Sequence, residues 1–171
     1  MFRKATYEDI GLIKDLAYKI WPAAYGSILS GEQILYMLAQ IYNDSALQKQ
    51  MHDGQDFIMV LSDRLTVGFA SFSPVEENAL VYKLHKIYLL PAVQGAGLGE
   101  KLLFHIIDTV KQKGGEVLKL NVNRHNPARE FYVKHGFVVT EEVDIPIGHG
   151  YFMNDFIMEK NLTQENVYSR R

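Results

Sequence analysis

The sequence contains no cysteine. This absence excludes disulfide frameworks, cysteine-bound zinc, iron–sulfur clusters and cysteine nucleophiles. The sequence also lacks an excess of either charge, because 18 Lys and Arg residues stand against 20 Asp and Glu residues for a formal net charge of -2. Such a chain exerts no general attraction on nucleic acid or on an anionic membrane. Any anionic ligand must therefore be held by local groups.

Long apolar runs are missing too. The first five residues, MFRKA, lead into polar sequence, and no apolar stretch approaches the roughly 18 residues that cross a bilayer. We therefore expect a cytoplasmic protein with no membrane or nucleic-acid partner. The 171 residues, 47% hydrophobic and 22% charged, are typical of a globular chain. We expect one domain over residues 1–162 and a polar tail over residues 163–171.

Hydrophobic periodicity predicts an α/β fold with a mixed central sheet flanked by helices. Thr6 with Asp9, and Ser30 with Gln33, have the spacing of helix-capping pairs, and Pro22 is expected to end the first helix. The predicted helices cover about 6–22, 30–42, 45–52, 98–113 and 127–135. The predicted strands cover about 57–61, 65–72, 79–90, 117–122, 137–143 and 151–159.

One glycine-rich segment indicates a phosphate site. Gly95, Gly97 and Gly99 fall between a predicted strand and a predicted helix, where backbone N–H groups and the positive end of the helix dipole favour an anion. The spacing G-x-G-x-G differs from the dinucleotide pattern G-x-G-x-x-G, and no Gly-Lys-Ser/Thr follows as in a P-loop. A glycine-rich helix start without a ligand remains the structural alternative.

Two motifs in order resemble the GNAT family of N-acetyltransferases. The pattern Gln94-x-x-Gly97-x-Gly99 is similar to the family's acetyl-CoA pyrophosphate loop, and the run from Asn126 to Phe137 is similar to its second motif. The order of elements over about residues 2–160 also matches the GNAT fold. Scattered aromatic residues and the late segment 153–160 further resemble a bacterial branch that includes polyamine acetyltransferases of the PaiA type.

The resemblance implies roles for individual residues. Tyr132 would give a proton to the departing thiolate, and Asn126 would orient acetyl-CoA or cap its helix. The backbone of the strand residues Ile87, Tyr88 and Leu89 would pair with the pantetheine arm. The loop amides that would hold the pyrophosphate belong to Gln94, Gly95, Ala96, Gly97, Leu98 and Gly99.

The general base is harder to assign, because Lys83 and Asn121 occupy the two positions where the family usually has a carboxylate. Histidine side chains ordinarily titrate near neutrality. His85 lies on the same predicted strand as Lys83 and is the best remaining candidate for the base. The histidines lack metal-ligand spacing, so we expect no metal. The residues that would contact the acceptor amine are Trp21, Tyr25, Tyr151 and Asp155, although the aromatic ones could equally fill the core.

The sequence therefore predicts transfer of an acetyl group from acetyl-CoA to a primary amine, such as a polyamine or another small or peptide amine. Without cysteine no acetyl-cysteine intermediate can form, which favours direct attack within a ternary complex. Two other functions stay open: a non-catalytic acyl-CoA-binding regulatory module on the same fold, and a nucleotide-dependent enzyme that uses the glycine loop. The family resemblance also suggests a homodimer.

Overall fold

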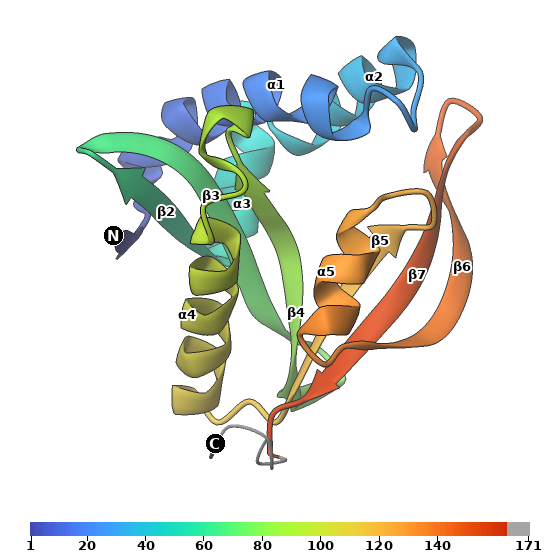
Figure 1. The fold of residues 1–171 in the computed structure, drawn as a ribbon. Helices are drawn as coiled ribbons and strands as arrows, with labels where there is room; N and C mark the ends of the chain where they lie inside the picture. The colour runs from blue at the N-terminus through green and yellow to red at the C-terminus, as the bar shows by residue number, and fades with distance from the viewer. Residues whose placement is uncertain (164–171) are drawn as a thin grey trace. The chain divides into compact units, whose positions relative to one another are not determined.

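The computed structural model describes residues 1–163 (Figure 1). The predicted tail lies outside the described residues except for Thr163. The strands are β1 Phe2–Lys4, β2 Asp56–Ser62, β3 Leu65–Val75, β4 Asn78–Leu89, β5 Val117–Asn123, β6 Val138–Gly148 and β7 Tyr151–Asn161. The α-helices are α1 Ile10–Tyr25, α2 Gly31–Ile41, α3 Asp44–His52, α4 Leu98–Gln112 and α5 Ala128–Lys134, and the short 3-10 turns η1 and η2 cover Tyr7–Asp9 and Pro91–Val93.

The seven strands follow the order β1-β2-β3-β4-β5-β7-β6. The chain divides into two compact units that are interleaved in sequence. The first unit contains Met1–Ser73 and Leu84–Leu103, and the second contains Pro74–Lys83 and, of the described chain, residues 104–163. Strand β4 and helix α4 each contribute one part to either unit. No helix within residues 1–163 is both long enough and apolar enough to cross a membrane.

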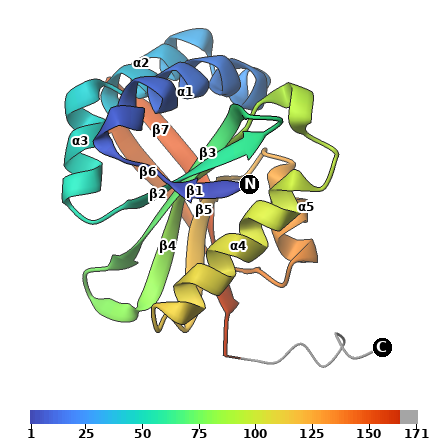
Figure 2. The ribbon, with the colours of Figure 1, turned by 90° about the vertical axis from the view of Figure 1, so that its left-hand side faces the viewer.

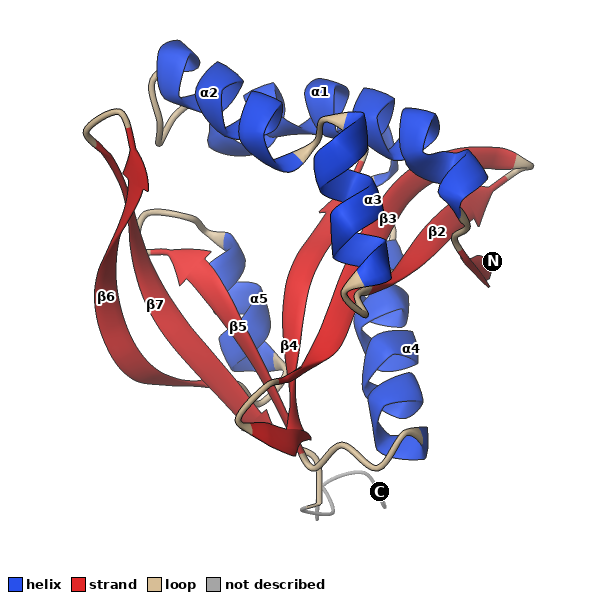
Figure 3. Ribbon diagram, turned by 180° about the vertical axis from the view of Figure 1, so that it is seen from behind, coloured by secondary structure: helices blue, strands red, loops and turns tan. Residues whose placement is uncertain are grey.

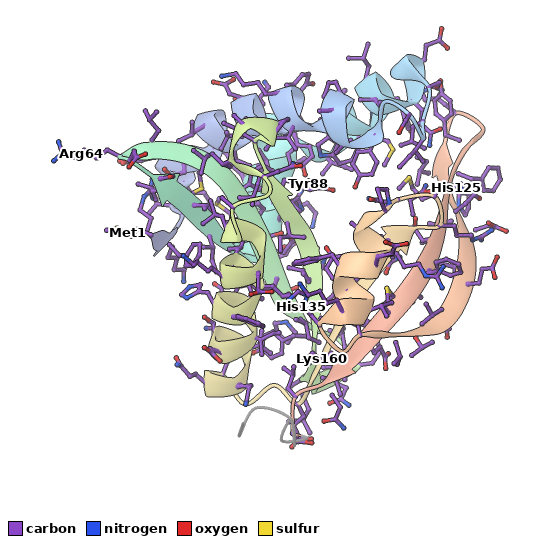
Figure 4. The ribbon with its side chains drawn as sticks, viewed as in Figure 1. Met1, Arg64, Tyr88, His125, His135 and Lys160 are labelled. Atoms are coloured by element: carbon purple, nitrogen blue, oxygen red, sulfur yellow. The ribbon has the colours of Figure 1, made fainter. Side chains whose placement is uncertain are left out.

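In the first unit, β1, β2 and β3 form antiparallel pairs, and helices α1, α2 and α3 lie side by side (Figures 2 and 3). Ser30 accepts a hydrogen bond from the Gln33 backbone at 3.1 Å, so the predicted cap of α2 is confirmed. The β2–β3 turn consists of Asp63 and Arg64, both with positive φ, and Arg64 projects from its tip (Figure 4). Such a two-residue turn matches the twist of a hairpin.

In the second unit, β7 pairs antiparallel with both β5 and β6, and α5 lies beside these strands (Figure 1). Strand β6 ends the strand order and reaches Gly148, beyond its predicted end at Val143. It tolerates Pro146 because an edge strand does not need every backbone N–H for pairing. The core of this unit includes Ile106, Val110, Leu118, Leu120 and Met158, all at most 2% exposed.

The prediction that Pro22 ends the first helix is wrong. Helix α1 continues to Tyr25, and the Gly26 backbone N–H donates to the Pro22 carbonyl at 3.0 Å. Proline removes one helical donor at a cost of about 3 kcal/mol. The extra turn buries Tyr25, which is 9% exposed and packs against the Trp21 ring at a centroid distance of 4.7 Å, and this burial offsets the loss.

Strand β1 was not predicted from the sequence. Arg3 lies opposite Met59 of β2, and the Ala5 backbone N–H donates to the Phe57 carbonyl at 2.8 Å. Three residues are too few to show a period-two pattern. Their extended form depends on pairing with a segment more than fifty residues away.

Candidate active site

The glycine segment joins the end of β4 to the start of α4 within the first unit. Gly95 and Gly97 have φ values of 86° and 80°, in the left-handed region that favours glycine. A Cβ atom added at either position would meet no described atom within 4 Å. The surface beside these two residues is therefore open, and their conformation is the local reason for glycine.

The segment is fixed to the strand that precedes it. The Gln94 side-chain amide donates to the Leu89 carbonyl at 3.0 Å, and the Gln94 backbone N–H donates to the Pro91 carbonyl at 3.2 Å. Lys101 donates its backbone N–H to the Gly97 carbonyl, so the N–H groups of Leu98 and Gly99, in the first turn of α4, have no acceptor within the helix. These orphan donors, together with the helix dipole, suit an anionic group such as a pyrophosphate.

Strands β3 and β4 approach closely where Gly68 meets the residues predicted to line the pantetheine arm. A Cβ atom on Gly68 would lie 2.4 Å from the Tyr88 carbonyl oxygen and 2.6 Å from the Leu89 side chain. No side chain fits there without moving β4. The position of this part of β4 therefore depends on glycine at residue 68.

An aromatic cluster packs around the side chain of Tyr88. Trp21, Tyr25 and Phe69 lie with ring centroids 5.9, 6.3 and 5.7 Å from the Tyr88 ring. The Tyr25 and Tyr88 hydroxyl oxygens are 2.8 Å apart, and Figure 4 marks Tyr88 near α1. Trp21 and Tyr25 thus fill the core, which was the alternative to a role in acceptor binding. Their predicted contact with the acceptor remains a prediction.

Lys86 is buried on the same strand, at 7% exposure. Its Nζ donates to Oε1 of Gln50 at 2.7 Å and of Gln55 at 3.3 Å, and it lies 5.3 Å from the Phe57 ring centroid. A buried ammonium needs such acceptor oxygens and ring faces to offset its lost hydration. This network was not predicted, because nothing in the sequence distinguishes a buried lysine in a strand from an exposed one.

His85, the predicted base, contacts a hydroxyl. Its Nε2 lies 2.7 Å from Ser73 Oγ, so one ring nitrogen is engaged within the first unit. Which partner donates depends on the histidine tautomer. The assignment of His85 as a base remains a prediction.

Helix α5 of the second unit carries the second motif. Tyr132 is 7% exposed, and its ring lies 5.4 Å from that of Phe131 and 5.6 Å from that of Phe137. The Asn126 side-chain oxygen accepts from the Ala128 backbone at 2.9 Å. Asn126 therefore caps the start of α5, one of its two expected roles.

The far end of α5 is held by β7. Lys160 Nζ donates to the His135 carbonyl at 2.6 Å, and Figure 4 shows both residues at that end of the helix. Burial lowers the pKa of Lys160. Gly136, with φ of 89°, ends the helix in the left-handed conformation. Both ends of the helix that carries Tyr132 are thus fixed by side chains.

A buried carboxylate lies on β7 of the second unit. Asp155 is 5% exposed, and its Oδ2 accepts a hydrogen bond from Asn121 Nδ2 of β5 at 3.4 Å. Burial raises the pKa of Asp155, while Asn121, Lys83 and Arg124 lower it. Burial and the charge of Lys119 lower the pKa of Lys83.

Two further residues of the second unit, Arg124 and Tyr151, lie next to the edge strand β6. Arg124 forms ion pairs with Glu142 at 3.2 Å and Asp144 at 2.5 Å, which ties it to β6. Tyr151 is half-buried at the first position of β7, opposite Gly148. Within residues 1–163 no three His, Asp or Glu side chains gather as a metal site.

Comparison with known proteins identifies a family. Residues 27–147 match the family described as "Acetyltransferase (GNAT) domain". Spermidine N(1)-acetyltransferase from Thermoplasma acidophilum is 29% identical over 164 residues, which cover 92% of this chain and 94% of that protein. A [ribosomal protein bS18]-alanine N-acetyltransferase from Haemophilus influenzae is 36% identical over 88 residues, or 52% of this chain and 56% of that one.

A solved structure resembles the whole fold. The PaiA N-acetyltransferase from Thermoplasma acidophilum, in complex with coenzyme A, aligns with a TM-score of 0.80 at 28% identity. The alignment covers 94% of this chain and 98% of that one.

Proposed function

Because the chain belongs to the GNAT family of acetyltransferases, we propose that it transfers the acetyl group of acetyl-CoA directly to a primary amine in a ternary complex. The observation that carries this proposal is the glycine segment between β4 and α4. Gly95 and Gly97 hold left-handed conformations with open space beside them, and the first N–H groups of α4 follow directly. These features fit a pyrophosphate recognised by backbone donors, which needs no net positive charge.

The chemistry requires two proton transfers. An alkylamine with a pKa of about 10.4 is mostly protonated at pH 7, and freeing it costs about 4.6 kcal/mol. A base that accepts this proton lowers the barrier, and a donor assists the thiolate that departs. We assign the donor role to Tyr132, because it occupies the family's tyrosine position in the second motif. His85 is the sequence-based candidate for the base.

We further propose a polyamine or another small primary amine as the acceptor. The support is the overall similarity to a protein named as a spermidine acetyltransferase. Asp155 supplies a buried carboxyl group suited to bind an ammonium group, and Tyr151 lies on the same strand. Trp21 and Tyr25 remain predicted acceptor contacts, and their rings are buried in the core of the first unit, at 3% and 9% exposure.

The wider setting is proposed from the sequence and the family. Residues 1–162 act as one acetyltransferase domain in the cytoplasm, as a homodimer.

Thiol release from acetyl-CoA tests the proposal directly. The purified protein is mixed with acetyl-CoA and a panel of amines: spermidine, spermine, a monoamine, an amino acid and a peptide with a free N-terminus. We expect turnover with the polyamines first. Absence of turnover with every amine, together with absence of coenzyme A binding, would contradict the proposal.

One observation favours a second candidate, an acyl-CoA-binding regulatory module. Lys83 and Asn121 occupy the positions of the family's usual carboxylates. This alternative predicts coenzyme A binding without turnover of any amine. Thermal shift measurements with coenzyme A, NAD and ATP also separate both candidates from a nucleotide-dependent enzyme, because only the ligand that binds raises the melting temperature.

A further inference from the structure

The Asp155 side chain lies on the face of β7 opposite to the face that contacts α5. Its neighbour Phe156 lies under Arg129 of α5, with the guanidinium carbon 4.7 Å from the ring centroid. Successive residues of a strand point to opposite faces, so Asp155 points the other way. In the register of β5 and β7, Asp155 pairs with Asn123, and Asn121 pairs with Ile157. Asn121 and Asp155 are thus diagonal neighbours on one face.

The two oxygens of this carboxylate differ. Oδ2 accepts the hydrogen bond from Asn121, whereas Oδ1 is buried and has no hydrogen-bond partner among the described residues. A buried carboxylate oxygen without a donor is costly, and native structures rarely leave one unsatisfied. An N–H group from a ligand would relieve this cost.

The position of Asn121 in the sequence points to a role for the Asp155 carboxylate. Asn121 stands where many family members have a glutamate on this strand, and the same residue contacts Asp155. A carboxylate missing from β5 is therefore supplied to the same part of the sheet from β7. We propose that Asp155 is the catalytic residue that accepts the proton from the acceptor amine, with Asn121 as its positioning residue. This inference rests on the proposed acetyl transfer.

Positive charges in the second unit favour the ionised form of Asp155. Arg124 lies near it but is itself paired with Glu142 and Asp144 of β6. Lys83 of β4 acts on Asp155 through its charge, and the pKa of Lys83 is itself lowered by burial and by Lys119 of β5. Burial raises the pKa of Asp155 above the ordinary aspartate value, which makes it a better proton acceptor than a solvated aspartate.

The step balances in atoms and charge. The substrate ammonium gives one proton to Oδ1, and the free amine forms the N–C bond with the thioester carbonyl. The C–S bond then breaks, and the thiolate takes a proton from Tyr132. The nitrogen of the new amide loses a second proton, which restores Tyr132, and Asp155 releases its proton to solvent. The products are the acetylated amine, the coenzyme A thiol and one proton.

The pH dependence of kcat with spermidine and acetyl-CoA tests this role. The parent protein should lose activity as the pH falls through the pKa of Asp155. We expect Asp155→Asn to lower kcat about 100-fold or more. The variant's remaining activity should rise about tenfold per pH unit toward the pKa of the free amine, because only amine already deprotonated in solution reacts.

Glu159→Gln is the matched control, because it removes one carboxylate charge from the same strand. It should keep the parent pH profile. Asn121→Ala should move the acidic limb to higher pH, because it removes a hydrogen bond that favours the ionised carboxylate. The exchange variant Asn121→Asp with Asp155→Asn keeps the pair and moves the carboxylate to β5, so it should recover part of the lost kcat.

An independent measurement does not need turnover. In protein labelled with ¹³C at aspartate side chains, the Asp155 carboxyl signal, assigned by its absence in Asp155→Asn, should shift when spermidine is added. An unshifted signal overturns the inference, and so does an Asp155→Asn variant that keeps the acidic limb while His85→Gln loses it. If the parent acetylates no amine, the proposed function fails, and the ¹³C shift alone decides whether Asp155 contacts an amine.

Discussion

The Tyr25 and Tyr88 hydroxyl oxygens lie 2.8 Å apart, and this contact links the last turn of α1 to the end of β4. Tyr88 is one of the three residues expected to pair through the backbone with the pantetheine arm. The Tyr88 side chain packs against Trp21 and Tyr25 of α1, within the aromatic cluster. Helix α1 and the strand proposed to bind acetyl-CoA are therefore coupled by one hydrogen bond within the first unit.

A double-mutant cycle measures this coupling. Tyr25→Phe and Tyr88→Phe should each lower the free energy of unfolding by about 1 kcal/mol, as expected for a lost hydrogen bond. The double variant should lose less than the sum of the two, because either change alone already breaks the contact. Urea unfolding of the four proteins gives the values. Strictly additive losses would show that the two hydroxyls contribute independently.

The conformation of Gly97 leads to a prediction about ligand binding. Gly97→Ala forces a left-handed backbone on alanine, at a cost of about 1–2 kcal/mol, and places a methyl group beside the proposed pyrophosphate donors. We expect coenzyme A affinity to fall about tenfold or more, since about 1.4 kcal/mol is a factor of ten in binding. Isothermal titration calorimetry with coenzyme A measures the change.

Gly54→Ala is the matched control. Gly54 also has a positive φ, 103°, with open space around its Cβ position, but it lies in the turn between α3 and β2. It should lose a similar amount of stability and keep the parent affinity for coenzyme A. Equal losses of affinity in both variants would mean that Gly97 acts only through general stability.

The family, the α/β fold and the enzyme class were predicted from the sequence, and all three are confirmed. The reason lies in local signals. Gly95 and Gly97 need the positive φ that only glycine adopts easily, and the apolar spacing from Leu98 to Val110 belongs to one helix. Such features depend on residues that are close in the sequence.

Features that depend on distant residues were not predicted. The continuation of α1 through Pro22 brings Tyr25 against Tyr88, and no sequence pattern near Pro22 indicates that contact. The contact between Asn121 and Asp155 joins residues 34 positions apart and needs the β5–β7 register. Asn121 was recognised only as the place of a missing carboxylate, because a side chain arriving from β7 has no signature in β5.

Tyr132→Phe tests the proposed proton donor. The change removes one hydroxyl from a buried ring and keeps the ring contacts with Phe131 and Phe137. We expect kcat with spermidine to fall about 100-fold, within the usual range for a general acid, and coenzyme A affinity to stay at the parent value. Steady-state kinetics and calorimetry provide the two numbers. An unchanged kcat would remove Tyr132 from the mechanism and favour a regulatory module.

Asp9 makes the stability of the first unit depend on pH. Its carboxylate accepts two hydrogen bonds from the Arg3 guanidinium, at 2.8 and 2.9 Å, and one from the Thr6 backbone at 2.9 Å. The Arg3 hydrogen bonds hold the pKa of Asp9 below its ordinary value. A carboxyl group whose pKa is lower in the folded state stabilises the protein above its unfolded pKa, and this contribution is lost as the pH falls through the folded pKa.

Asp9→Asn should therefore lower the free energy of unfolding at pH 7 by about 1–2 kcal/mol, the usual effect of losing a helix cap and an ion pair. Below about pH 4, the free energy of unfolding should fall less steeply in this variant than in the parent. Urea unfolding between pH 2 and 7, compared with the exposed Asp44→Asn, measures both effects, and parallel curves for parent and Asp9→Asn would refute the assignment.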